Sequence, residues 1–237
     1  MSNPDYAHVF FNPTPALSST LAVRITVKNV LGTPQHIVPL YSEDHSGQLL
    51  KPLSGSHVQP EDRIRYFHTR TAHQLLAGAN GIKIGERYMK ILSRNILADT
   101  SIGHGWTELP DLWHFVRALV FPASTETMFG SSILSLNPEL FEDFWAFDRS
   151  VPTLLKGLPH WLTPKAHRHR DRMLKAIKKW HVFAIEHSDF SKIGPDDPDW
   201  DRYFGTKYVK ARQSFLHDVE VMNPDGRASE DLGLLFA

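Results

Sequence analysis

The segment from Asn137 to His181 constrains the fold most, because it carries the pattern of two amphipathic helices joined by a short loop. Asn137 and Pro138 form a start signal, since asparagine accepts a hydrogen bond from a free amide and proline suits the first helical turn. Gly157 suits a left-handed cap at the other end. Between them, apolar residues recur at spacings of three and four and predict a buried stripe: Leu140, Phe141, Phe144, Phe147, Val151, Leu154 and Leu155.

Thr163 and Pro164 repeat the start signal for a second helix. Its predicted apolar stripe consists of Ala166, Met173, Ile177, Trp180 and Ala184. The loop between the two helices is unusually apolar for a surface turn and consists of Leu158, Pro159, His160, Trp161 and Leu162. We expect this loop to meet a membrane, a substrate or another part of the fold. For Trp161, simple packing between the two helices is the alternative to an interface.

Two further long helices are predicted upstream. One begins near Arg63, and its expected apolar side contains Leu75, Ile82, Tyr88, Ile91 and Leu92. The other runs from about residue 109 to 129, with a bend at Pro122. Its expected core-facing residues are Leu112, Phe115, Val116, Leu119 and Met128.

The two ends of the chain are predicted from weaker patterns. Residues 21–31 alternate as a strand would. A helix is predicted over residues 206–221, followed by a turn at 223–227 and a last helix that Ser229 caps. The fold class is therefore mainly α, as one domain over residues 1–237, poorly defined over 1–60, helical over 65–237, and with little β-structure near the N-terminus.

Composition excludes several classes of protein. Cysteine is absent, which excludes disulfides, thiolate metal sites and cysteine nucleophiles. Lys plus Arg and Asp plus Glu both number 26, so no overall field attracts nucleic acid. There is no run of about 18 apolar residues and no signal-peptide pattern at the N-terminus. We therefore expect an intracellular protein with no transmembrane anchor and no nucleic-acid partner.

The charged clusters are interpreted as solvated surface. Basic residues follow the second helix on the face opposite its apolar stripe, which favours solvent over nucleic acid: Lys165, His167, Arg168, His169, Arg170, Arg172, Lys175, Lys178 and Lys179. His167 and His169 point apart on a helix. Asp197, Asp199 and Asp201 lack the glycine and glutamate that complete a calcium loop. Because no hydrolase, dinucleotide or phosphate-loop motif occurs, we assign no catalytic, cofactor-binding or metal-binding residue.

Four blocks of sequence resemble one enzyme family in order and spacing, and a fifth resembles it more loosely. The stretches FEDFWAFDRSVPTLLKGLP and PKAHRHRDRMLKAIKKWH resemble the F and G helices of fungal cytochrome P-450 monooxygenases. Residues 105–130 resemble the D and E helix region, and residues 228–237 resemble the opening of the I helix. The stretch HTRTAHQLLAG resembles the C helix more loosely. The resemblance is nearest to the branch that contains prostacyclin synthase and the cholesterol and oxysterol hydroxylases, and it covers only the N-terminal half of the catalytic domain.

The resemblance implies a haem-dependent monooxygenase that acts on a lipophilic substrate, needs a redox partner and associates with a membrane. It implies that Leu158, Pro159, Trp161 and Leu162 form a loop that faces the substrate channel or the membrane. It also makes Arg70 or His73 a conceivable contact of the haem propionates.

The absence of cysteine departs from the family, whose haem iron is held by a cysteine thiolate. We therefore expect a fragment that binds no haem stably and is inactive alone. The alternative is a non-enzymatic helical protein that binds a lipid or a partner.

Overall fold

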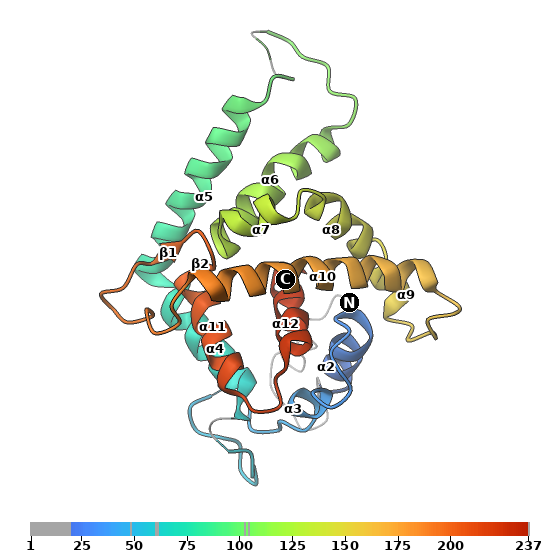
Figure 1. Cartoon of the computed structure of the whole chain (residues 1–237), viewed down its shortest axis with the longest axis vertical. Helices are drawn as coiled ribbons and strands as arrows, with labels where there is room; N and C mark the ends of the chain where they lie inside the picture. Colours follow the sequence, from blue (N-terminus) through green and yellow to red (C-terminus); the bar gives the residue numbers. More distant parts are fainter. Residues whose placement is uncertain (1–19, 48, 60–61, 102, 104, 237) are drawn as a thin grey trace, which may run out of the picture.

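The computed structural model describes residues 20–47, 49–59, 62–101, 103 and 105–236. Over these residues the chain is mainly helical, as the sequence predicts, and holds one two-stranded sheet (Figure 1). The elements follow in the order α2 (Thr20–Ile25), the π-helix η1 (Thr26–Val30), α3 (Val38–Ser42), α4 (Ile64–Leu75), α5 (Gly78–Ala98), α6 (Leu112–Phe129), α7 (Ser131–Leu136), α8 (Leu140–Asp148), α9 (Val151–Leu154), α10 (Pro164–His187), β1 (Trp200–Asp201), β2 (Gly205–Thr206), α11 (Lys207–Asp218) and α12 (Pro224–Phe236).

Helix α10 is the centre of the main hydrophobic core. It packs against α7 and α8 on one side and against α12 on the other (Figure 1). Its predicted stripe is confirmed, since all five residues from Ala166 to Ala184 are buried. Trp180 lies edge-on to Phe129 and Phe204, and its indole Nε1 donates to the carbonyl of Tyr203 over 2.6 Å. Burial of this stripe is the main force that holds the surrounding helices together.

A second, smaller core joins the N-terminal helices to the C-terminal part of the chain. It consists of Val27, Ile37, Val38, Tyr41, Ile64, Leu216, Val219 and Met222. These residues come from η1, from α3 and the residue before it, from α4, and from the end of α11 and the turn that follows it. Segments nearly 200 residues apart in sequence therefore stabilise one another.

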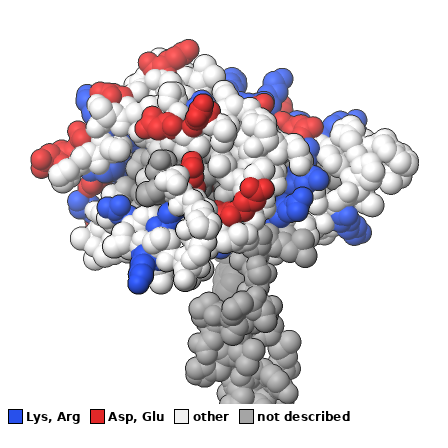
Figure 2. Space-filling model, turned by 90° about the horizontal axis from the view of Figure 1, so that it is seen from below, with Lys and Arg blue, Asp and Glu red and all other residues white. Residues whose placement is uncertain are grey.

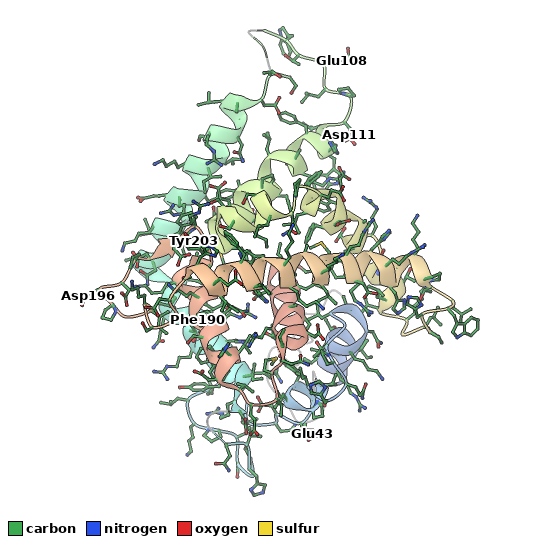
Figure 3. All side chains as sticks on the ribbon, viewed as in Figure 1. Glu43, Glu108, Asp111, Phe190, Asp196 and Tyr203 are labelled. Atoms are coloured by element: carbon green, nitrogen blue, oxygen red, sulfur yellow. The ribbon has the colours of Figure 1, made fainter. Side chains whose placement is uncertain are left out.

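Helices α5 and α6 pack along each other and project from the rest of the molecule (Figure 1). We call this helix pair the arm. Figure 3 shows Glu108 and Asp111 at the far end of the arm. The Asp111 side chain accepts a hydrogen bond from the amide of His114 and caps α6. Several residues expected in the core of these helices are exposed instead, among them Leu112 (65%) and Val116 (38%) of α6.

The β1–β2 hairpin ties the arm to the core. The two strands pair antiparallel, with Trp200 opposite Thr206. Gly205 has a positive φ of 70° and lies directly against the carbonyl of Met128, so any Cβ at this position would collide with α6. The indole Nε1 of Trp200 donates to the carbonyl of Thr127 over 2.9 Å. The hairpin is therefore fixed to the C-terminal end of α6.

The strand predicted over residues 21–31 is wrong. This segment forms α2 and η1. Val27 and Val30 are buried and lie three residues apart. Burial in this segment therefore follows the period of a helix and not the alternation of a strand.

The first helix of the 137–181 segment is interrupted, where the sequence predicts one continuous helix. It divides into α8 and α9 around Arg149 and Ser150. Pro152 has no amide hydrogen for the carbonyl of Asp148, and the Ser150 hydroxyl donates to the carbonyl of Ala146 over 2.8 Å. Leu155 is 45% exposed rather than buried.

The predicted helix ends of that segment are confirmed in part. Gly157 has the predicted left-handed φ of 63°, although α9 itself ends at Leu154, and α10 begins at Pro164 after Thr163, as predicted. Asn137 does not cap α8, because its side-chain amide donates to the carbonyls of Ile133 and Ala176. The last helix begins at Pro224, five residues before Ser229, and is capped by Asn223, which accepts from the amide of Gly226 over 2.9 Å.

None of the described helices combines the length and the apolar character needed to span a membrane.

Candidate functional site

The apolar loop between α9 and α10 lies on the surface. Three of its apolar side chains are exposed: Leu158 by 40%, Trp161 by 75% and Leu162 by 51%. The alternative in which Trp161 packs between the two helices is thereby excluded. The loop is shaped by Gly157 and by hydrogen bonds from the amides of Leu162 and Thr163 to the carbonyl of Pro159. It presents apolar side chains at one end of α10, available to an external apolar phase.

Polar and basic side chains border this apolar loop. His160 and His167 bring their rings within 5.0 Å of each other, and Thr163 contacts the His167 ring nitrogen over 3.2 Å. Lys156 and Lys165 are exposed on either side of the loop. An apolar surface with a basic rim is typical of a segment that lies at an interface between water and an apolar phase.

Arg70 and His73 lie on α4, and both side chains are exposed. They are not brought together with the apolar loop. Their assignment as haem contacts stays a prediction.

A buried polar cluster links α10, α11 and α12. We call it the Asp231 cluster. Asp231 is fully buried and accepts from His181 Nε2 over 2.8 Å and from Gln213 Nε2 over 2.9 Å. The guanidinium of Arg212, also buried, donates to Glu230 over 2.7 Å and lies 3.9 Å from Asp231. A buried charge is tolerated only when it is paired in this way.

The Asp231 cluster extends to α4 and α3. His68 Nε2 lies 3.6 Å from Glu230. Burial, followed by the positive charge of Arg212, lowers the pKa of His68 to about 4, so the ring is neutral at pH 7. Burial acts to raise the pKa of Glu230. The pKa is nevertheless lowered, because the positive charge of a protonated His68, the guanidinium of Arg212, and hydrogen bonds from Tyr41 and Arg212 outweigh burial. Burial and the neighbouring Glu230 raise the pKa of Tyr41.

One signal in the sequence points to the Asp231 cluster. Glu230 and Asp231 sit between Ala228 and Leu232, whose burial continues the apolar stripe of α12. If Ser229 capped the last helix, as the sequence predicts, both acids would lie in its first turn, where negative charge is favourable and solvated. With the helix beginning at Pro224, they fall in its middle and face the core.

The acidic connector between α10 and α11, residues 188–206, is held by its own contacts. Asp197 accepts from the amide of Gly194, and Asp201 accepts from the amides of Tyr203 and Phe204, all over 2.8 Å. Figure 3 shows the neighbouring Asp196 at the outer edge of this connector. Over the part of the chain that the structure describes, no three metal-ligating side chains converge.

The basic residues of α10 are mostly engaged within the protein. Arg172 pairs with Asp143 over 2.9 Å and Lys178 with Asp225 over 2.6 Å. Arg170 donates to the carbonyl of Asn29 over 3.1 Å. On the face drawn in Figure 2, acidic and basic side chains are interspersed rather than segregated. This distribution agrees with a solvated surface.

The chain is similar to part of several longer fungal proteins. It is 37% identical over 183 residues to cytochrome P450 monooxygenase fsoE of Humicola fuscoatra, a match that covers 76% of this chain and 32% of that protein. It is 38% identical over 178 residues to cytochrome P450 monooxygenase efuG of Hormonema carpetanum, covering 75% of this chain and 31% of the relative. Its curated relatives are fungal cytochrome P450 monooxygenases.

A third relative, cytochrome P450 monooxygenase calL of Penicillium decumbens, is 27% identical over 201 residues, which cover 84% of this chain and 37% of that protein. The chain thus spans about a third of the length of these relatives. No protein-family profile and no solved structure matches it. The mainly helical fold is consistent with part of a cytochrome P450-like helical domain.

Proposed function

We propose that this chain forms the N-terminal helical part of a fungal cytochrome P450 monooxygenase that acts on a lipophilic substrate. The observation that carries the proposal is the identity of 37% over 183 residues to a curated enzyme of this kind. The central α10 and its neighbours, which resemble the F, G and I helices, support it. The finer assignment, to the branch near prostacyclin synthase and the cholesterol and oxysterol hydroxylases, rests on the resemblance of the helix motifs alone.

The residues of this chain do not fit a haem-thiolate site. The chain has no cysteine to ligate the iron. Two histidines within the described core are also unsuited to ligate haem, because the buried His181 is bonded to Asp231 and the half-buried His68 lies beside Glu230. We therefore derive no catalytic step from this chain. The thiolate, and the half of the pocket around it, would have to come from sequence outside these residues.

We assign the loop of Leu158, Pro159, Trp161 and Leu162 to the mouth of a substrate channel or to a membrane surface. Its exposed apolar side chains and their basic rim support this assignment. A redox partner would be required by the complete enzyme, as it generally is by relatives of this family.

Sequencing the mature transcript through and beyond the codon for Ala237 tests the enzyme assignment directly. We expect an open reading frame that continues into a segment with the loop whose cysteine ligates the haem iron in this family. A stop codon directly after Ala237 would contradict the assignment for this polypeptide. In either case, the purified 237-residue chain should show no thiolate-type absorption band when it is reduced under carbon monoxide, and a clear band would overturn our view of its haem chemistry.

A second candidate function is non-enzymatic binding of a lipid or a partner protein. The observation that favours it is the same exposed loop, because Trp161 at 75% exposure is available without any further domain. The two functions differ in a simple measurement: a binding protein takes up a lipophilic fluorescent probe with no haem present, and removing the loop side chains abolishes the uptake.

A further inference from the structure

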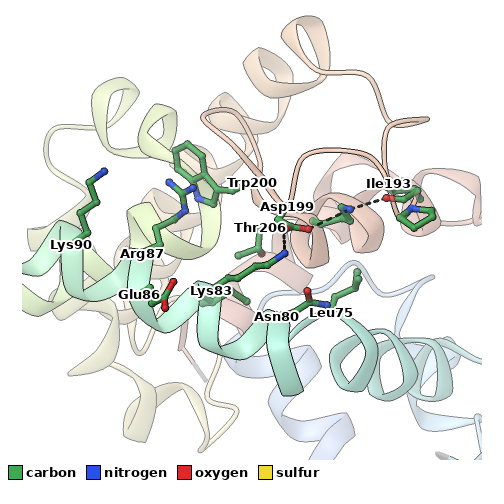
Figure 4. A pocket seen from close by; sticks show the side chains of 14 residues that line it. Leu75, Asn80, Lys83, Glu86, Arg87, Lys90, Ile193, Asp199, Trp200 and Thr206 are labelled. Carbon is green, nitrogen blue, oxygen red and sulfur yellow. Dashed lines mark hydrogen bonds and ion pairs between the residues drawn. The ribbon is translucent and has the colours of Figure 1, made fainter.

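A groove of about 680 Å³ lies between α5 and the connector that carries β1, well away from the apolar loop. Figure 4 shows Lys83, Arg87 and Lys90 following one side of α5 along this groove, with Trp200 and Asp199 on the opposite side. The volume is in the range that holds a small organic molecule.

The groove carries an excess of positive charge. Four cationic side chains line it, Lys83, Arg87, Lys90 and Lys207, against two anionic ones, Glu86 and Asp199. The first three recur at spacings of four and three residues, so they share one face of α5. The local surplus contrasts with the zero net charge of the whole chain.

Two of these cations are engaged within the protein. Lys83 pairs with Asp199 over 2.6 Å. Lys207 is nearly buried and donates to the carbonyls of Gly194 and Asp197 over 2.7 and 2.8 Å. These contacts fix the connector to α5 and to α11, and they give the groove a rigid wall.

Arg87 and Lys90 remain without an acceptor among the described residues. The guanidinium of Arg87 lies over the ring of Trp200, with 4.2 Å between its Cζ and the ring centroid. Trp200 is itself held in place by its hydrogen bond to Thr127. Stacking fixes the plane of the guanidinium and leaves its N–H edge free for a planar anion.

We propose that this groove binds a small organic anion. Its carboxylate or phosphate contacts Arg87 and Lys90, and its apolar body lies against Ile84, Ile193 and Pro195, which also line the groove. Charge-assisted hydrogen bonds to a fixed guanidinium would orient the anionic group. The proposal goes beyond the proposed function and does not depend on it.

Isothermal titration calorimetry of the purified protein with defined probes tests the proposal. The probes are 1-naphthyl phosphate and 1-naphthoate, which share an apolar body, with 1-naphthol as the uncharged analogue. We expect saturable binding of at least one anion and much weaker binding of 1-naphthol. The tighter of the two anions identifies the head group. The combined substitution Arg87→Gln and Lys90→Gln should raise the dissociation constant at least about tenfold, because charged hydrogen bonds are lost.

Arg117→Gln is the matched control. Arg117 stacks on Trp145 at 4.7 Å in the same manner, but it does not line the groove. This substitution should leave binding unchanged, whereas Arg87→Lys should weaken it only in part. If the double variant unfolds, Lys90→Gln alone serves, since this side chain is exposed. The proposal fails if neither anion saturates, if 1-naphthol binds as tightly, or if Arg117→Gln weakens binding as much as the groove variants.

Discussion

Helices α10 and α5 are both long and both carry a periodic apolar stripe, yet only α10 buries it. The five stripe residues of α10 are at most 7% exposed. On α5, Ile82 is 66% exposed, Met89 56% and Leu97 86%, while Ile91 is buried. α10 has helices on two sides, whereas the main helical neighbour of α5 is α6. The comparison teaches that a periodic stripe predicts a helix, and that burial requires neighbours on the apolar face.

The arm should therefore be less stable than the core around α10. An apolar face left in water contributes no hydrophobic stabilisation, and segments with few buried contacts open first. The same surface is available to a partner or to further sequence. The following predictions test the contrast between α10 and the surfaces that stay exposed.

Trp180→Ala should have the largest effect on stability. Trp180 is fully buried and donates a hydrogen bond to Tyr203. Its removal should lower the free energy of unfolding by about 3–5 kcal/mol. Met89→Ala on α5 is the control and should cost less than about 0.5 kcal/mol, as exposed substitutions do. Urea denaturation followed by circular dichroism measures both, and equal losses would contradict the contrast between the two helices.

The stability of the core should fall as the pH drops from about 6.5 to 4. The pKa of His68 is 6.5 in the unfolded chain and about 4 in the fold, so the unfolded state binds more protons in this window. The loss should reach at most about 3 kcal/mol and stop below about pH 4. The lowered pKa of Glu230 acts in the same direction at the acid end.

Urea denaturation at a series of pH values measures this effect. His68→Gln should flatten the decline between pH 6.5 and 4, because it removes the group that titrates while Arg212, Glu230 and Asp231 remain. His36→Gln, at an exposed histidine, controls for the loss of an imidazole. A decline of unchanged slope in His68→Gln would show that another group governs the acid sensitivity.

The mainly helical character of the chain and the α10 stripe could be predicted from the sequence because both depend on local patterns. The period of the apolar residues and the Thr163–Pro164 start are properties of a few neighbouring residues, and α10 follows them. The strand predicted at residues 21–31 failed because a short apolar run fits either period, and packing of Val27 and Val30 decides the outcome.

The Asp231 cluster and the groove could not be predicted, because each needs residues distant in sequence. Asp231 meets His181 across 50 positions, and Lys83 meets Asp199 across 116. No local pattern specifies such pairs. The loop of Leu158 to Leu162 could be predicted only in part. Its apolar character is visible in the local sequence, but its exposure depends on which other elements surround it.

Two glycines should respond in opposite directions to alanine. Gly157 has a positive φ and its added Cβ would lie 2.9 Å from Asn29, so Gly157→Ala should destabilise the core by about 1 kcal/mol or more. Gly85 lies inside α5 with open space around it, so Gly85→Ala should stabilise the arm by about 0.5–1 kcal/mol. Hydrogen exchange of the α5 amides measures the second effect locally. A destabilised arm in Gly85→Ala would contradict the open space around Gly85 and would indicate that another molecule covers this face of α5.

Trp161→Ser should have the smallest effect on stability, below about 0.5 kcal/mol, because the side chain is 75% exposed. Its effect should appear in binding instead. If the apolar loop faces a membrane, the substitution should weaken sedimentation with phosphatidylcholine vesicles about threefold to tenfold, since an indole inserted among lipids contributes on the order of 1 kcal/mol.

Trp113→Ser is the matched control for the loop, because Trp113 is 64% exposed on the arm. It should leave vesicle binding unchanged if the loop is the surface that meets the lipid. Equal weakening by both substitutions would assign lipid contact to exposed tryptophans in general. Vesicle binding that neither substitution changes would contradict the assignment of the loop to a membrane surface. The two tryptophans therefore differ in role. Trp180 is buried on α10 and stabilises the core, whereas Trp161 is 75% exposed and is available for binding.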